Sequence, residues 1–204
     1  MYQIVQEVTS QIEVEKSRFI GMAFPLKEKE EVGQILKDLQ KQHPKARHIC
    51  YAMIYDDVSR SNDDGEPSGT AGRPLLEVLK KNELNHILLV VIRYFGGVLL
   101  GAGRLLRTYV EAGKKAIEQA QWLQEKEMIY YEVALSYEQL ERFETLLRKE
   151  KSYVAFRDYE EKVNIGFSVE NSLDEKFSEC FRGETITQKK EIRTMLLPVE
   201  RRNI

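Results

Sequence analysis

An uninterrupted run of aliphatic residues, Ile87–Ile92, lies near the middle of this 204-residue chain. A membrane-spanning helix needs about 20 apolar residues, so this run is far too short to cross a bilayer. Short apolar runs of this kind are typical of a strand that is buried on both faces. Phe95-Gly-Gly then breaks the pattern. The run therefore predicts a packed core around one strand, and not a membrane protein.

Upstream of this run, apolar spacing and turn residues predict further strands and helices. Phe19–Phe24 is an apolar strand that Pro25 ends. One helix is expected where apolar residues recur at intervals of three and four, at Val32, Ile35, Leu36 and Leu39. The other expected elements are a strand at Ile49–Tyr55, a loop at Asp56–Gly72, and a short helix at Leu75–Lys81 with Pro74 at its start.

Downstream of the run, a long helix is expected to reach about Trp122. Its apolar stripe is predicted at Leu106, Tyr109, Val110, Gly113, Ile117 and Ala120.

A second unit is predicted from about Met128 onward, because a new alternation of apolar and polar residues begins there. Its expected elements are a strand at Ile129–Leu135, a helix carrying Leu140, Phe143, Leu146 and Leu147, strands at Tyr153–Tyr159 and Val163–Val169, a helix carrying Leu173, Phe177, Cys180 and Phe181, and a strand at Ile186–Val199. This order is ferredoxin-like. We therefore expect an α+β protein of two domains, residues 1–125 and 126–204, joined near Gln121–Met128.

Composition restricts the function classes. The chain has 31 Lys and Arg against 33 Asp and Glu, so a net charge of -2 gives no global attraction to nucleic acid or anionic lipid. The cysteines, Cys50 and Cys180, are far apart and have no zinc-site spacing, which favours two reduced thiols. The first residues lack the apolar core of a signal peptide. We expect a cytoplasmic protein without a metal site or cofactor.

A glycine- and arginine-rich segment between the buried strand and the long helix is the first candidate binding site. Its candidate phosphate- or nucleic-acid-binding residues are Arg93, Tyr94, Gly96, Gly97, Gly101, Gly103, Arg104 and Arg107. Free backbone N–H groups at a helix start attract anions, and arginines add forked hydrogen bonds to phosphate. The alternative is a tight turn that permits close packing. The segment matches neither a P-loop nor a dinucleotide fingerprint.

An acidic loop, Asp56–Gly72, is the second candidate. Five acids and one arginine fall in Asp56–Glu66. A turn that caps neighbouring backbone groups is favoured over cation binding, because the spacing is not that of a calcium loop. His48 and Cys50 are expected on one face of a strand, where a core thiol beside a surface imidazole is favoured over a catalytic pair. No catalytic residue is predicted.

Two stretches resemble the signatures of the YigZ/IMPACT family. They are Asp63-Asp-Gly-Glu-Pro-Ser-Gly-Thr-Ala-Gly-Arg-Pro and Val91-Ile-Arg-Tyr-Phe-Gly-Gly-Val-Leu-Leu-Gly-Ala-Gly. Tyr51-Ala52 and Arg107-Thr-Tyr also look like the family's pattern. The motif-loop residues that the resemblance singles out are Asp64, Gly65, Glu66, Ser68, Gly69, Thr70, Gly72 and Arg73. The chain departs from the family pattern at Arg104, where a glycine is usual, and at Thr108, where an alanine is usual.

The resemblance implies an N-terminal domain like the second domain of a small-subunit ribosomal protein, and a ferredoxin-like C-terminal domain similar to one in elongation factor G. It also implies a link to translation, because eukaryotic relatives regulate translational stress signalling through protein partners. We expect a regulatory protein that binds RNA, the ribosome or a translation-factor partner. The alternative is an enzyme acting on a phosphorylated small substrate, or a hydrolase. Some related chains carry a proline-dipeptidase label, for which this sequence shows no metal-ligand set.

Overall fold

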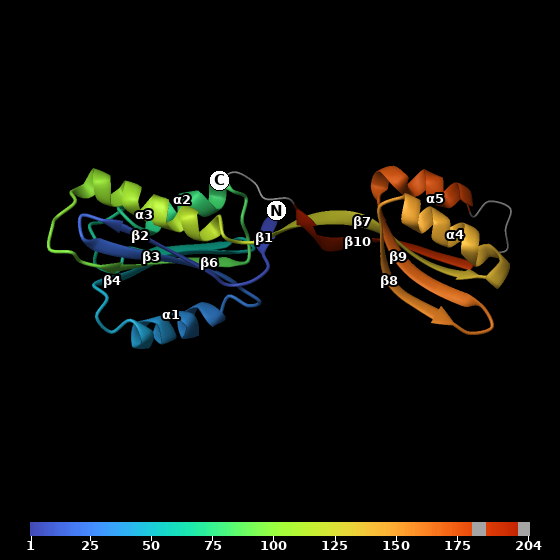
Figure 1. Cartoon of the computed structure of the whole chain (residues 1–204), viewed down its shortest axis with the longest axis horizontal. Coiled ribbons are helices and arrows are strands. Elements are labelled where there is room, and N and C mark those ends of the chain that lie inside the picture. Colours follow the sequence, from blue (N-terminus) through green and yellow to red (C-terminus); the bar gives the residue numbers. More distant parts are fainter. Residues whose placement is uncertain (181–186, 200–204) are drawn as a thin grey trace. The chain divides into compact units, whose positions relative to one another are not determined.

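The computed structural model describes residues 1–180 and 187–199, and it divides into two compact units. Among the described residues, the first unit comprises Met1–Gln124 and residues 197–199, and the second comprises residues 125–180 and 187–196. Each unit has a sheet with helices packed against it (Figure 1). The α+β class predicted from the sequence is therefore confirmed.

The first unit is built on a five-stranded antiparallel sheet with the order β2-β3-β6-β4-β5. Its strands are β2 (Val8–Val14), β3 (Ser17–Pro25), β4 (His48–Tyr55), β5 (Val58–Asn62) and β6 (Ile87–Tyr94). The short strand β1 (Tyr2–Ile4) pairs instead with the start of β7 (Trp122–Leu135), from Trp122 to Gln124.

The central strand of this sheet is β6, which contains the apolar run. It lies between β3 and β4, and every residue from Ile87 to Arg93 is buried. The prediction of a strand buried on both faces is confirmed. The physical reason is that helices cover both sides of the sheet, so neither set of alternating side chains reaches water.

Three helices cover the two faces of the sheet. Helices α2 (Gly72–Lys81) and α3 (Ala102–Ile117) pack on one face of the sheet, and α1 (Glu31–Gln42) packs on the other (Figure 1). The core under α2 and α3 includes Leu75, Leu89 and Tyr109, whereas the core under α1 includes Leu39 and Leu88. Successive residues of β6 therefore face different cores, which decides the surroundings of Arg93 and Tyr94.

The second unit has the predicted ferredoxin-like order. Its elements after β7 are α4 (Tyr137–Lys149), β8 (Ser152–Tyr159), β9 (Val163–Glu170), a 3-10 turn (Asn171–Leu173), α5 (Asp174–Cys180) and β10 (Thr187–Val199). The strands lie in the order β10-β7-β9-β8, and an aromatic cluster that includes Tyr131, Phe143 and Phe167 fills the core. Two residues of the sequence-based assignment, Phe181 and Ile186, lie outside the described residues.

Three local predictions are wrong. The expected loop contains strand β5, whose residues after Val58 are exposed and polar because it is an edge strand that pairs with β4 alone. The long helix ends at Ile117, and Trp122 begins β7 instead of closing the helix. The buried stripe of α3 passes through Leu105, and not through Leu106, which is 37% exposed.

Candidate functional site

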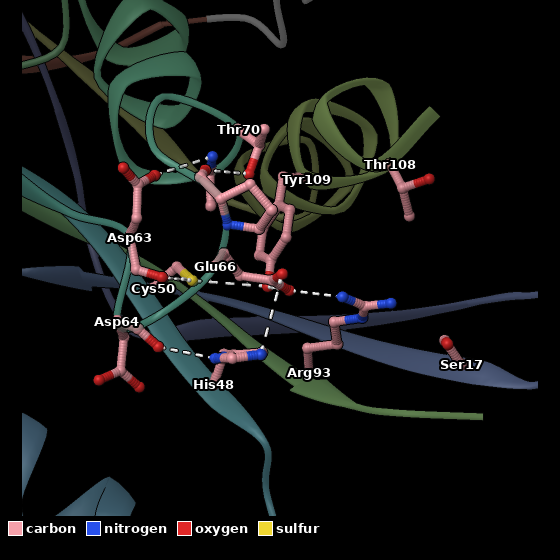
Figure 2. Close-up of polar contacts among 12 residues, drawn as sticks. Ser17, His48, Cys50, Asp63, Asp64, Glu66, Thr70, Arg93, Thr108 and Tyr109 are labelled. Atoms are coloured by element: carbon pink, nitrogen blue, oxygen red, sulfur yellow. Dashed lines mark hydrogen bonds and ion pairs between the residues drawn. The ribbon is translucent and has the colours of Figure 1, made fainter. Parts of the chain in front are cut away.

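A buried carboxylate, Glu66, is the centre of a polar cluster where the two sequence motifs meet (Figure 2). Its Oε1 atom accepts hydrogen bonds from Arg93 Nη1 and from the Tyr109 hydroxyl, each at 2.7 Å. Glu66 and Arg93 are only 7% and 5% exposed. An ion pair this deep is stable only while both charges are present, because either one alone would be desolvated without compensation.

The Arg93 side chain leaves the end of β6 toward α3. Its guanidinium carbon lies 5.3 Å from the centre of the Phe19 ring and 5.6 Å from that of Phe95. Arg93 Nε is buried and has no hydrogen-bond partner within the described part of the chain. The aromatic faces offset part of this cost through cation–π attraction. Arg93 is thus held by Glu66 and two rings.

His48, on the neighbouring strand β4, is oriented by the motif loop. Its Nδ1 atom lies 2.7 Å from the backbone carbonyl oxygen of Asp64. A carbonyl can only accept a hydrogen bond, so Nδ1 carries a proton. The other ring nitrogen, Nε2, points toward Glu66 and lies 3.8 Å from its Oε2 atom, beyond hydrogen-bond distance (Figure 2).

Cys50 lies beneath the cluster and is fully buried. Its thiol donates to the carbonyl oxygen of Asp63 at 3.0 Å and lies 3.4 Å from the Tyr109 hydroxyl. Burial raises the pKa of the Cys50 thiol to about 12, and burial likewise raises the pKa of Tyr109. Cys50 is therefore a protonated core thiol, as the sequence suggested, and not an activated nucleophile.

We expect Cys50 to resist alkylation by iodoacetamide in the native protein at mildly alkaline pH, because the thiolate is the reactive form and the thiol has no solvent access. Peptide mapping by mass spectrometry should find it unmodified, and fully modified after unfolding in guanidinium chloride. Rapid native labelling at this position would contradict the buried thiol.

Asp63 organises the motif loop from its first position. Its carboxylate accepts backbone N–H bonds from Gly69, Ala71 and Gly72 at 2.8–3.0 Å; Ala71 is the N-cap residue of α2 and Gly72 is its first residue. Burial alone would raise the pKa of Asp63, but the three backbone donors outweigh it and hold the pKa below its ordinary value. The loop thus caps backbone groups, which is the interpretation that the sequence favoured.

Asp64, Thr70 and Gly65 also support this turn. Asp64 accepts the Ile49 backbone N–H at 2.6 Å, and the Thr70 hydroxyl donates to the Pro67 carbonyl. Gly65 has a φ of +81° and lies over the His48 ring. Ser68 and Arg73 are exposed.

The glycine- and arginine-rich segment is divided among different surroundings. Arg104 is exposed and pairs with Glu15 at 2.8 Å, while Arg107 is exposed and makes no ion pair with any described residue. The Tyr94 hydroxyl contacts His43 Nδ1 at 2.8 Å on the α1 side of the sheet. The three predicted cations and Tyr94 are therefore not gathered around one point.

The glycines of this segment have two different roles. A side chain at Gly96 would collide with the backbone of Lys16 at 2.1 Å, so Gly96 permits close packing against the β2–β3 turn. A side chain at Gly97, Gly101 or Gly103 would meet nothing within 4 Å. Gly101 has a φ of +74° and precedes α3 without any side-chain cap.

A cavity of about 680 Å³ opens beside the cluster, between the motif loop and the start of α3. Arg47, His48, Glu66 and Arg93 form its polar wall. Its apolar wall is formed by Pro67, Phe95, Leu99, Leu100 and Leu105. Leu99 is 86% exposed and Phe95 47% exposed. Such a combination of apolar surface and a few converging polar groups is typical of a ligand site.

Sequence reasoning missed Asp63, Tyr109 and Arg47 as members of this region. Asp63 opens the acidic motif, and its role depends on backbone groups that come together only in the folded loop. Tyr109 was assigned to the helical stripe, which is correct, but its hydroxyl also reaches Glu66. Arg47 carries no signal beyond its place beside His48.

Two features, a metal-binding cluster and a membrane-spanning helix, are absent from residues 1–180 and 187–199. No cluster of three or more His, Cys, Asp or Glu side chains in this part of the chain is arranged to hold a metal ion. No helix in the same residues is long and apolar enough to cross a lipid bilayer.

Fold and site together define a two-unit α+β protein whose first unit carries a motif-built polar cluster. Residues 15–117 match the family model described as the Impact N-terminal domain. The chain is 37% identical over 172 residues to the IMPACT family member YvyE of Bacillus subtilis, covering 83% of this chain and 79% of that protein. It is 33% identical over 176 residues to the IMPACT family member YigZ of Escherichia coli, covering 84% and 86%. The chain belongs to the IMPACT family.

A solved structure resembles the whole chain as well. It is a crystal structure described as that of a hypothetical protein, with a TM-score of 0.58, 30% identity and coverage of 98% of both chains. This likeness extends over both units.

Proposed function

We propose that the chain is a cytoplasmic, translation-linked regulatory protein that works by binding RNA, alone or in the ribosome, and not by catalysis. The observation that carries the proposal is the charge of the outer surface of α2 and α3. Membership of the IMPACT family supports the link to translation, because the resemblance of this chain to that family implies a role in translational control.

The two helices carry seven basic residues against two acidic ones, Glu77 and Glu111, although the whole chain has a net charge of -2. Lys80, Arg104 and Lys115 lie in ion pairs with Glu77, Glu15 and Glu111. Four cations on this surface have no ion pair within the described part of the chain; they are Arg73, Lys81, Arg107 and Lys114. Local clustering of cations is what a near-neutral protein needs to attract a polyanion.

The shape of this surface supports the same proposal. A cavity of about 640 Å³ lies between α2 and α3, with Arg73, Lys81 and Lys114 around an apolar floor that includes Val78 and Val110. Phosphate groups can contact the cations while sugars and bases cover the apolar floor. Arg93 takes no part, because it is committed to Glu66. The phosphate contacts of the glycine- and arginine-rich segment then depend on Arg104 and Arg107.

The test replaces three unpaired cations together, in an Arg73→Ala/Arg107→Ala/Lys114→Ala variant. We expect weaker binding of a short single-stranded RNA in fluorescence anisotropy titrations. Each neutralised phosphate releases counterions, so the slope of log affinity against log salt should become shallower by about 2.

The matched control removes the same charge from the opposite side of the sheet, in a Lys29→Ala/Lys37→Ala/Lys41→Ala variant around α1. It should bind RNA like the unmodified protein. Equal losses in both variants would reduce the effect to net charge, and absence of RNA binding at low salt would reject the proposal.

A further inference from the structure

The cavity beside Glu66 contains two hydrogen-bond acceptors that the fold leaves unused. Glu66 Oε1 already receives two hydrogen bonds, whereas Oε2 receives none from the residues that the structure describes. His48 Nδ1 carries a proton for the Asp64 carbonyl, so in the neutral form of the ring Nε2 is an acceptor. The two free acceptors lie 3.8 Å apart. A ligand with two neighbouring donors can satisfy both.

The charge of the cavity selects among such ligands. Its charged wall has two guanidinium groups, Arg47 and Arg93, against one carboxylate, Glu66. Arg93 already neutralises Glu66 at 2.7 Å, and Arg47 is exposed without an ion pair in residues 1–180 and 187–199. A further cation, such as an ammonium group, would add like charge. The cavity therefore favours uncharged donors combined with an anionic group elsewhere in the ligand.

The start of α3 adds attraction for an anion in the same place. Gly101 and Ala102 line the cavity, and the helix begins there without a side-chain cap. The first N–H groups of a helix lack intrahelical partners and carry a partial positive charge. Together with the free Arg47 side chain, they place positive charge at this end of the cavity, which suits an anionic group such as a phosphate.

The apolar wall provides the third part. Phe95 is 47% exposed and lies against Arg93, and Leu99 and Leu100 continue the wall. Nucleic-acid bases stack on aromatic side chains, and apolar side chains cover their remaining surface. The volume of about 680 Å³ lies within the range of small-molecule sites.

We infer that this cavity binds one ribonucleotide unit. The vicinal ribose hydroxyls donate to Glu66 Oε2 and His48 Nε2, the phosphate meets Arg47 and the start of α3, and the base lies on the Phe95 wall. The inference rests on the proposed function, because it names the part of RNA that the domain recognises. The same chemistry is offered by a free ribonucleotide and by the 3′-terminal nucleotide of RNA, because every other nucleotide of RNA has its 3′ oxygen in a phosphodiester.

The ligand side of the test compares adenosine 5′-monophosphate with its 2′-deoxy and 3′-deoxy analogues by calorimetry. Each analogue lacks one hydroxyl donor and should bind about tenfold more weakly, since one hydrogen bond is lost and one acceptor in the cavity is left unpaired. In NMR spectra, the nucleotide should shift the ring nitrogen resonance of His48 Nε2. Equal binding of all three compounds, or no binding of any nucleotide, would overturn the inference.

The second part of the test substitutes exposed residues of the protein, so that the buried ion pair between Glu66 and Arg93 stays intact. Arg47→Ala should weaken nucleotide binding about tenfold, whereas the matched control Arg60→Ala, at an exposed arginine of β5, should not. Ala102→Phe should block the cavity from the exposed start of α3. If both cavity variants bind the nucleotide like the unmodified protein, the cavity is not the site.

Binding of a short RNA and of a DNA with the equivalent sequence distinguishes a free ribonucleotide from a nucleotide of RNA as the occupant of the cavity. It also distinguishes this inference from the proposed RNA binding at α2 and α3. If the free nucleotide displaces the RNA, both enter the cavity. If only the RNA shows the hydroxyl and Arg47 dependence, the bound unit is the 3′-terminal nucleotide of RNA. RNA and DNA that bind equally, with loss only in the α2–α3 variant, would overturn the ribose site and leave the proposed function standing. Free leucine that shifts the His48 resonance in place of the nucleotide would point to an amine ligand and reject the inference.

Discussion

Replacing Arg93 with methionine should lower the free energy of unfolding by about 3–5 kcal/mol, because it leaves the Glu66 carboxylate buried without its partner. Methionine retains the length and much of the apolar contact of the arginine stem. The loss therefore reports the charge and its hydrogen bond, and not a large cavity. Chemical denaturation followed by circular dichroism measures it directly.

A double-mutant cycle with Glu66→Gln makes this prediction sharper. Either single change should be costly, and the two changes together should cost clearly less than their sum, because the second removes the charge that the first left unpaired. The matched control is Arg104→Met, which breaks an exposed pair with Glu15 and should cost no more than about 1 kcal/mol. Equal costs for Arg93→Met and Arg104→Met would contradict a buried, coupled pair.

The sequence could predict the strand that carries Arg93, but not that Glu66 is the partner of Arg93. A run of six aliphatic residues has few solutions other than a buried strand, so Ile87–Ile92 was assigned correctly. Arg93 follows that run directly, and a cation there suggests an exposed strand end. The structure continues the strand to Tyr94 and covers it with α3, so the side chain is buried. Its partner is 27 positions away in sequence, and no local pattern encodes that distance.

The register of α3 shows a second limit of prediction from sequence. Leu105 and Leu106 are both apolar, and a stripe of period 3.6 can be drawn through either one. Packing against the sheet selects Leu105, and Leu106 is left among the residues that line the groove with α2. Strand β5 likewise could not be assigned from its own residues. Its exposed residues have no apolar alternation, because only backbone pairing with β4 makes it a strand.

The acidic loop shows what charge counting cannot reveal. Five acids within Asp56–Glu66 suggest mutual repulsion or a cation between them. In the folded loop, Asp63 and Asp64 accept backbone N–H groups, and Glu66 pairs with Arg93. The donors are mostly peptide groups that have no signature in the sequence. The turn residues predicted a capping loop correctly, but they did not show that Asp63 is the residue on which it depends.

Asp63→Ala should lower the free energy of unfolding by about 3 kcal/mol, because it removes three charge-assisted hydrogen bonds and leaves backbone donors at the start of α2 unpaired. Asp63→Asn keeps one oxygen acceptor without the charge and should lie between the alanine variant and the unmodified protein. Asp57→Ala is the matched control: Asp57 is exposed, so its removal should change stability by less than about 0.5 kcal/mol.

The pH dependence tests whether the charge of Asp63 is responsible. The pKa of Asp63 is lowered in the folded protein, so its ionised form contributes stability above the unfolded pKa of about 4. As the pH falls, the unfolded state takes up the proton first, and the contribution is lost progressively until the folded carboxyl is protonated as well. The stability difference between the unmodified protein and Asp63→Asn should therefore be constant near neutral pH and shrink below about pH 4. A difference that stays constant through this range would show that shape, and not charge, fixes the loop.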